Sequence, residues 1–162
     1  MMEVFWQELT LGLHDSKQVT RVLIRLVAAT LLGAIVGIQR ERTRKPAGLR
    51  THVLVCLATA AFVIGGSSFG MTTDGLSRVI QGTITGIGFI GAGSILKLSE
   101  QHHIKGLTTA ASVWMTAAIG VTVGLGSLGI ALMITVLAVG ILSLEKLERR
   151  IEAKRGNDEQ KV

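Results

Sequence analysis

Three long stretches of this sequence carry no Asp, Glu, Lys or Arg, and they constrain the fold more than any other feature. They cover residues 51–73, 79–96 and 107–144. A membrane-spanning helix needs about 20 apolar residues, within a range of about 17–25. The longest stretch is therefore too long for one crossing, and its glycine-rich segment 124–129 predicts a break between two helices.

The composition also excludes several classes of protein. Hydrophobic residues make up 48% of the chain, and 20 of its 162 residues are glycine. This composition is more apolar than that of a soluble monomeric protein. The single Pro and the 17% of charged residues argue against a disordered chain. The lone Cys56 excludes an intramolecular disulfide framework.

The pattern predicts an all-α integral membrane protein, a compact bundle of about five transmembrane helices. The predicted spans are residues 22–38, 49–69, 79–98, 107–125 and 128–144. Residues 1–20 are predicted to form an outer interfacial segment with a short helix, residues 21–144 the transmembrane domain, and residues 145–162 a charged cytoplasmic tail. The first segment has no basic stretch before Lys17, so we do not expect a cleaved signal peptide.

Lys and Arg gather on one side of these spans. They are dense between the first and second spans and after the fifth, and sparse on the opposite side. The positive-inside rule then places the N-terminus outside and the C-terminus in the cytoplasm. The net charge of +6 indicates this topology and an attraction to anionic lipid headgroups, and we expect no nucleic-acid partner.

The basic segment between the first two spans is the first candidate site. Pro46 ends the preceding helix, and Gly48 allows the reversal into the next one. Free N–H groups at the start of that helix would suit an anion, a lipid headgroup or an acidic partner surface. An ordinary positive-inside anchor on lipid phosphates is the alternative. The candidate residues are Arg40, Glu41, Arg42, Arg44, Lys45, Arg50, Thr51 and His52.

Small residues at helical spacing form the second candidate site. Such residues let helices approach closely in lipid, where the hydrophobic drive for association is weak. The third span carries more glycines than one helix contact requires, so either close packing or a backbone-lined intramembrane site or hinge fits it. The candidate residues are Gln81, Gly82, Gly86, Gly88, Gly91, Gly93, Thr108, Thr109 and Ser112.

Four segments, taken together, resemble the membrane domain of the MgtC/SapB family. They read GIQRER at 37–42, KPAGLRTH at 45–52, GIGFIGAG at 86–93 and GLTTAASVW at 106–114. The chain is similar to a short SapB-type member that lacks the C-terminal ACT-like domain. The resemblance implies a bacterial inner-membrane protein that is associated with adaptation to low magnesium and acts on other membrane proteins.

Three functional hypotheses follow: a membrane regulator, a transporter or channel for Mg²⁺ or another small solute, and an enzyme. Mg²⁺ needs hard oxygen ligands, and the five predicted spans contain no Asp or Glu. The nucleophile and base candidates Ser94, His52, His102 and His103 lack a carboxylate at a motif spacing. We therefore predict a regulator, expected to be a homodimer, with no catalytic residues, metal site or cofactor.

Overall fold

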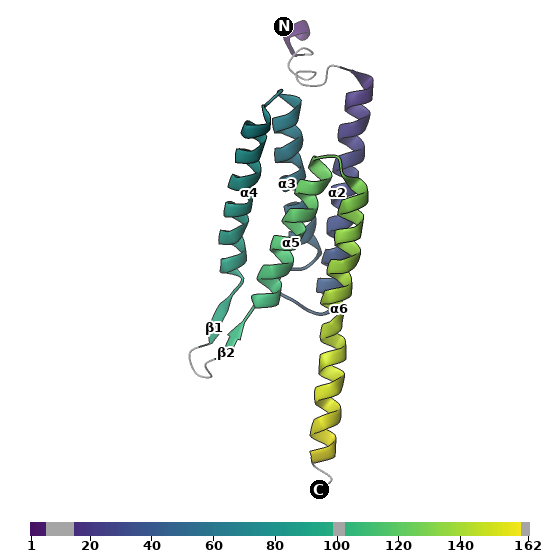
Figure 1. The fold of residues 1–162 in the computed structure, drawn as a ribbon, viewed down its shortest axis with the longest axis vertical. Helices are drawn as coiled ribbons and strands as arrows, with labels where there is room; N and C mark the ends of the chain where they lie inside the picture. Colours follow the sequence, from purple (N-terminus) through teal and green to yellow (C-terminus); the bar gives the residue numbers. More distant parts are fainter. Residues whose placement is uncertain (6–14, 99–102, 160–162) are drawn as a thin grey trace.

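The computed structural model describes residues 1–5, 15–98 and 103–159, and Figure 1 shows long helices lying side by side. The described N-terminal residues 1–5 and the end of α6 lie at opposite ends of the bundle. Strands β1 (Leu96–Leu98) and β2 (His103–Lys105) form a short antiparallel hairpin between two helices. The long helices are α2 (Ser16–Arg42), α3 (Leu49–Ser68), α4 (Thr73–Gly93), α5 (Leu107–Gly124) and α6 (Leu128–Glu159).

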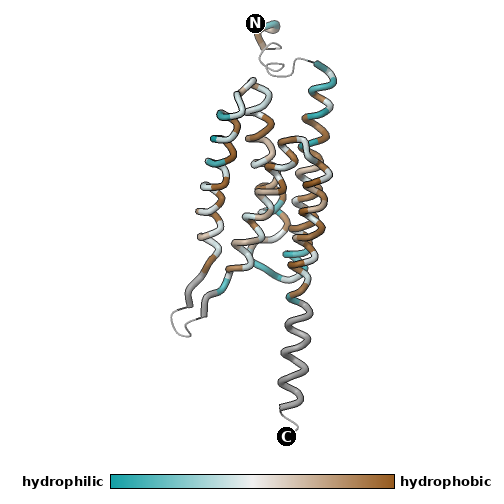
Figure 2. Tube along the Cα trace, in the orientation of Figure 1, coloured by the Kyte–Doolittle hydropathy of each residue, from teal (hydrophilic) through white to brown (hydrophobic). Residues whose placement is uncertain are grey.

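Four of these helices, α2, α3, α5 and the first part of α6, are long and apolar enough to cross a membrane. Apolar side chains on their outer faces are exposed, as expected for contact with a lipid bilayer. Figure 2 shows hydrophobic positions along these helices. The prediction of an all-α membrane protein is therefore confirmed, with α4 as an additional helix beside the four.

The predicted third span at 79–98 is wrong at its C-terminal end, because α4 stops at Gly93 and residues 96–98 form β1 instead. At its other end α4 extends past the predicted span and starts at Thr73. Within these limits α4 is one continuous helix that runs through all its glycines. Polar residues in its first half keep it outside the set of helices that are apolar enough to span.

Two other helices extend past the predicted spans. Helix α2 begins at Ser16 rather than at residue 22, and α6 continues from the predicted end at 144 to Glu159. Hydropathy marks where lipid can cover a helix, whereas backbone hydrogen bonds can continue into water. The predicted interfacial segment 1–20 is described only in part, since residues 6–14 lie outside the described residues.

Helix α3 contacts α2, α4 and α5, and glycines allow the closest of these approaches. A Cβ on Gly37 would lie only 2.7 Å from the Cα of Leu49, and one on Gly124 only 2.7 Å from the Cβ of Val63. Small residues therefore set the distances from α3 to α2 and α5. The core between the helices is formed by Ala29, Leu32, Val36, Cys56, Ala60, Ile64, Ile119, Val123, Ala131 and Leu142.

Arg25 shows how a charged residue is accommodated inside a predicted span. Its Nη1 donates a hydrogen bond of 2.9 Å to the carbonyl oxygen of Gly124, the last residue of α5. The carbonyls at a helix C-terminus lack partners in their own helix and carry partial negative charge. Arg25 thus links α2 to the end of α5 and satisfies one of these carbonyls.

The loop between α2 and α3 turns differently from the prediction. Arg44 takes the left-handed conformation at φ 54°, whereas Gly48 has an ordinary φ of −102°. The small size of Gly48 still matters, because a Cβ there would lie 3.0 Å from a carboxylate oxygen of Glu41. We call the end of the bundle that holds this loop (residues 43–48) and the β-hairpin the basic end.

Candidate functional site

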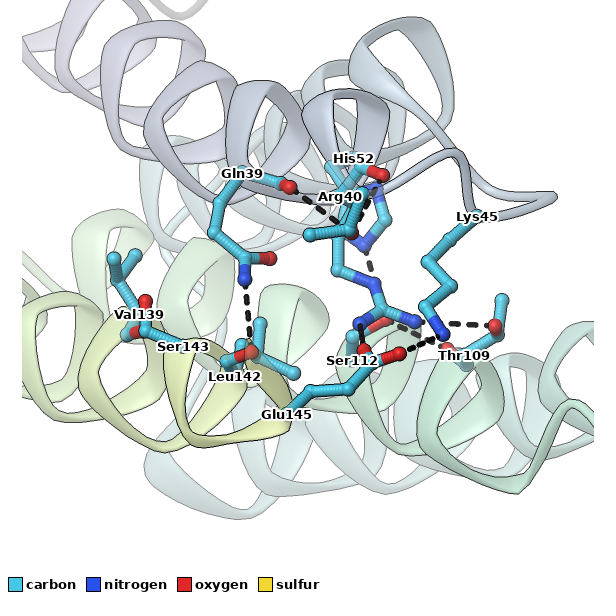
Figure 3. Close-up of polar contacts among 11 residues, drawn as sticks. Gln39, Arg40, Lys45, His52, Thr109, Ser112, Val139, Leu142, Ser143 and Glu145 are labelled. Atoms are coloured by element: carbon cyan, nitrogen blue, oxygen red, sulfur yellow. Dashed lines mark hydrogen bonds and ion pairs between the residues drawn. The ribbon is translucent and has the colours of Figure 1, made fainter. Parts of the chain in front are cut away.

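Arg40, in the last turn of α2, is the only charged residue with no exposed surface in the part of the chain whose side chains are described. Its Nη2 donates a hydrogen bond of 3.2 Å to Oγ1 of Thr109 on α5. Its Nη1 lies 3.9 Å from Oε2 of Glu145 on α6, as an ion pair (Figure 3). Buried charge is costly near lipid, so this residue marks a functional candidate.

His52 lies beside Arg40 and is also fully buried. Its Nδ1 is 2.8 Å from the carbonyl oxygen of Gly48, and its Nε2 is 3.2 Å from Oγ of Ser112 on α5. Ser112 in turn donates to the carbonyl oxygen of Thr109 at 2.8 Å. These bonds continue the Arg40 contacts into one buried polar cluster that joins α2, α3 and α5.

Glu145 closes this cluster from α6. Its side chain is 22% exposed and also forms an ion pair with Lys45 of the α2–α3 loop. Gln39, next to Arg40, donates from Nε2 to the carbonyl oxygen of Leu142 at 2.9 Å. Nε and Nη1 of Arg40 make no hydrogen bond with the described residues, so the guanidinium depends on Glu145 for compensation of its charge.

The two predicted candidate sites therefore meet. Arg40 and His52 come from the predicted anion site, whereas Thr109 and Ser112 come from the predicted intramembrane site. Lys45 reaches the same cluster through Glu145. We call the set Arg40, Lys45, His52, Thr109, Ser112 and Glu145 the polar cluster.

The other basic residues of the predicted site lie outside the polar cluster. Arg42, Arg44 and Arg50 are exposed, and Thr51 is half-buried. Arg42 follows Arg40 by two residues, about 200° around the helix, which turns the two side chains to opposite sides. The exposed arginines form a cationic surface at the basic end.

Glu41 occupies the place where an anion was expected to bind. Its Oε2 accepts a hydrogen bond of 2.8 Å from the backbone N–H of Leu49, the first residue of α3. A carboxylate at a helix N-terminus satisfies an unpaired N–H and interacts favourably with the helix dipole. This N–H of α3 is therefore already capped by the chain itself.

We expect Glu41→Ala to lower the free energy of unfolding by about 0.5–1 kcal/mol, because it leaves the first N–H of α3 without this carboxylate. Thermal unfolding in detergent measures the change. Glu41→Gln keeps an oxygen acceptor without the charge and should lose less. Equal stability of Glu41→Ala and the unmodified protein would contradict the capping role.

The glycines of α4 have a different environment from those of α2 and α5. Only Gly91 has neighbours across a helix contact, with Ala110 of α5 at 3.7 Å from the position of its Cβ. Gly82, Gly86, Gly88 and Gly93 have nothing within 4 Å, and Gln81 and Thr108 are exposed. Gly82, Gly86, Gly88 and Gly93 therefore do not pack closely against another helix within the described residues.

The residues considered as nucleophile or base candidates lie in different parts of the chain. Both ring nitrogens of His52 have close partners, and Ser94 donates to the carbonyl oxygen of Gly91 at 2.7 Å. His102 lies outside the described residues, as does the side chain of His103. Among the described residues, no three His, Cys, Asp or Glu side chains lie together in an arrangement that could hold a metal ion.

Glu145 is the residue of the site that the sequence did not reveal. It directly follows the longest uncharged stretch and was assigned to the solvated tail. Its position in the sequence could have indicated a role in the site. Glu145 is the first acidic residue after the fifth predicted span, at the same predicted membrane boundary as Arg40. A carboxylate and an arginine at one boundary level favour pairing.

Comparison with known proteins gives consistent matches. Residues 26–150 match the MgtC family. Protein SrpB of Synechococcus elongatus is 42% identical over 139 residues, covering 78% of this chain and 76% of SrpB. Protein MgtC of Salmonella typhimurium is 40% identical over 129 residues, covering 78% of this chain and 54% of MgtC. The protein named putative magnesium transporter YhiD, of Escherichia coli, is 40% identical over 130 residues, covering 75% of this chain and 59% of YhiD.

None of these three names is that of an enzyme. The chain spans little more than half the length of MgtC and of YhiD. No solved structure gives a significant match.

Proposed function

Because the chain belongs to the MgtC family, we propose that this multi-pass bacterial membrane protein is an inner-membrane regulator. It is linked to magnesium homeostasis and stress adaptation, and it acts through other membrane proteins rather than by catalysis. Relatives named MgtC and putative magnesium transporter support the link to magnesium. The N-terminus lies outside and the tail after residue 144 lies in the cytoplasm, in accordance with the positive-inside rule.

The polar cluster is the observation that carries the choice of a regulator. A pathway for Mg²⁺ would need several oxygen ligands, because this ion gives up its water reluctantly. The one carboxylate in the cluster, that of Glu145, is instead engaged by two cations, Arg40 and Lys45. A divalent cation that approached from the basic end would meet positive charge and no uncompensated acidic lining in the described bundle.

The cationic surface of Arg42, Arg44 and Arg50 is the place where a partner or anionic lipid headgroups would bind. These side chains are exposed at the basic end, next to the polar cluster that ties α2, α3, α5 and α6 together. Each basic residue near an anionic membrane surface contributes about 1 kcal/mol of attraction. Binding at this surface would therefore act on the end of the bundle where four helices are joined.

We expect the purified protein in liposomes to give Mg²⁺ uptake no faster than protein-free liposomes, as measured with an entrapped Mg²⁺-sensitive dye. Proteoliposomes with a known Mg²⁺ channel provide the positive control. Uptake that rises with the amount of this protein alone would overturn the regulator and favour a transporter.

A second measurement tests the cationic surface in cells. The triple variant Arg42→Ala, Arg44→Ala, Arg50→Ala should insert normally, yet recover at least about tenfold less of the membrane proteins that co-purify with the unmodified chain. The matched control is Lys17→Ala with Arg21→Ala, which removes exposed cations near the other end of α2. If the triple variant recovered the same amount of co-purifying membrane proteins, the cationic surface would determine only the membrane topology of the chain.

The alternative function is a transporter or channel for Mg²⁺ or another small solute. The name of YhiD favours transport of Mg²⁺. An open groove of about 610 Å³ between α3 and α4 favours a different solute. The groove is lined almost entirely by apolar groups, which suits an acyl chain or an apolar solute better than a hydrated ion. Its lining residues include Leu54, Phe62, Val79, Gly82, Gly86 and Ile90.

A further inference from the structure

The groove between α3 and α4 is bordered by one row of residues on each helix. On α3 the row is Leu54, Ala58 and Phe62, which are four residues apart and therefore share one face of the helix. On α4, Gly82 and Gly86 line the groove at the same spacing. A Cβ on either glycine would meet nothing within 4 Å. The small residues on α4 thus leave this space open.

Two threonines are the polar side chains among the lining residues of the groove, and both hydroxyls donate within their own helix. Thr59 donates to the carbonyl oxygen of Val55 at 2.9 Å, and Thr83 donates to that of Val79 at 2.8 Å. A polar group that entered the groove would lose hydrogen bonds to water and find no free side-chain donor there. The groove therefore favours an apolar chain.

Helix α3 brings the groove to the level of the lipid. This helix is apolar enough to cross a membrane, and Leu54 and Phe62 are 63% and 58% exposed along it. Exposed apolar side chains on a spanning helix contact the hydrocarbon core of the bilayer. An acyl chain can therefore enter the groove from the side, without passing through water.

Arg50 occupies the next position on the α3 row, four residues before Leu54. It is exposed and lies in the first turn of α3, at the basic end. An arginine near the end of a membrane helix buries its stem along apolar surface and places its guanidinium at the headgroups. The guanidinium can bind a phosphate group through two parallel hydrogen bonds. The apolar row on α3 thus continues into a phosphate-binding side chain.

We propose that the groove binds one acyl chain of an anionic phospholipid whose phosphate is held by Arg50. Phe62 lies twelve residues after Arg50, which is about 18 Å along the helix axis. One leaflet contributes about half of a hydrocarbon core that is about 30 Å thick. A lipid of one leaflet therefore has the length to reach from the cation to the far end of the row. This inference deepens the proposed function, because Arg50 belongs to the cationic surface.

Charge decides which end of the groove takes the headgroup. Arg78 lies four residues before Gly82 on the α4 row, so the opposite end also has a cation. Asp74 lies one helical turn before Arg78, and a carboxylate at this spacing offsets the attraction for an anion. At the basic end Arg50 is one of three exposed arginines, which exceed the single charge of Glu41. The basic end therefore complements an anionic headgroup better.

Fluorescence quenching measures which lipid occupies the groove. The reporter is Phe62→Trp in a chain whose own tryptophans are replaced by Trp6→Phe and Trp114→Phe. The purified protein is placed in vesicles of phosphatidylcholine mixed with phosphatidylglycerol that is brominated in its acyl chains. We expect the anionic lipid to quench the reporter as if it bound about fivefold more tightly than phosphatidylcholine, as one basic residue near the membrane surface provides.

Four variants of the reporter chain separate the headgroup from the acyl chain. Arg50→Gln should remove the preference for phosphatidylglycerol, whereas Arg78→Gln, at the other end of the groove, should keep it. Gly86→Leu should remove it by filling the groove. The matched control is Gly88→Leu, which has the same open surroundings on α4 but does not line the groove.

Each of three results would overturn the proposal. The first is equal quenching by the two lipids in the unsubstituted reporter chain. The second is a preference that is lost in Arg78→Gln but kept in Arg50→Gln. The third is a preference that persists in Gly86→Leu, which would mean that the cationic surface attracts lipid without the groove. These vesicles contain neither Mg²⁺ nor a partner protein, so the result is independent of the uptake and co-purification experiments.

Discussion

Replacing Gly120 with alanine should lower the free energy of unfolding by about 3 kcal/mol, because the added methyl group has no space between two helices. A Cβ at this position would overlap Oγ1 of Thr59 and the carbonyl oxygen of Cys56 on α3. One of these atoms belongs to the backbone, so the helices themselves must separate. Thermal unfolding in detergent, or unfolding by SDS, measures the loss.

Gly140→Ala is the matched control for this experiment. A Cβ there meets nothing within 4 Å, and alanine favours a helix more than glycine does. We expect this variant to be as stable as the unmodified protein or slightly more stable. If Gly120→Ala and Gly140→Ala behaved alike, close contact between α3 and α5 would be disproved.

Removal of the Glu145 carboxylate should be the other large effect. Glu145→Ala leaves the fully buried Arg40 without its ion-pair partner, and breaking a buried pair costs about 3–5 kcal/mol. Because Glu145 is 22% exposed, we expect about 2–3 kcal/mol here, at the lower end of that range or just below it. The same unfolding assays measure it, and Arg42→Ala, which removes an exposed cation two residues away, is the control.

A double variant separates charge from packing. Arg40→Met combined with Glu145→Met removes both charges and keeps two long side chains, so its stability should exceed that of Glu145→Ala. A double variant that is less stable than Glu145→Ala would mean that the hydrogen bond from Arg40 to Thr109 outweighs the ion pair.

Much of the fold could be predicted from the distribution of charge. The predicted spans 49–69 and 107–125 differ by one residue from α3 (Leu49–Ser68) and α5 (Leu107–Gly124). Both helices end close to where lipid would end. The ends of α2, α4 and α6 could not be predicted in this way, because polar residues extend two of these helices and a hairpin shortens the third.

The candidate site could be predicted in its parts but not in its assembly. Arg40, His52, Thr109 and Ser112 were all identified as candidates, yet in two separate groups. Sequence spacing does not show that residues 40 and 109 touch, since that contact depends on how α2 and α5 each pack against α3. The geometry of one helix does predict that Arg40 and Arg42 point in different directions.

The packing of α2 on α3 has a further practical consequence. Cys56 is the single cysteine of the chain, and it is fully buried where a Cβ on Gly33 would lie 2.8 Å from its own Cβ. A thiol enclosed in this way is protected from membrane-impermeant maleimides, which need access to a thiolate. We therefore expect the unmodified protein not to react with these reagents. Single cysteines introduced at the helix ends can then be labelled one at a time to determine which end of each helix faces which compartment.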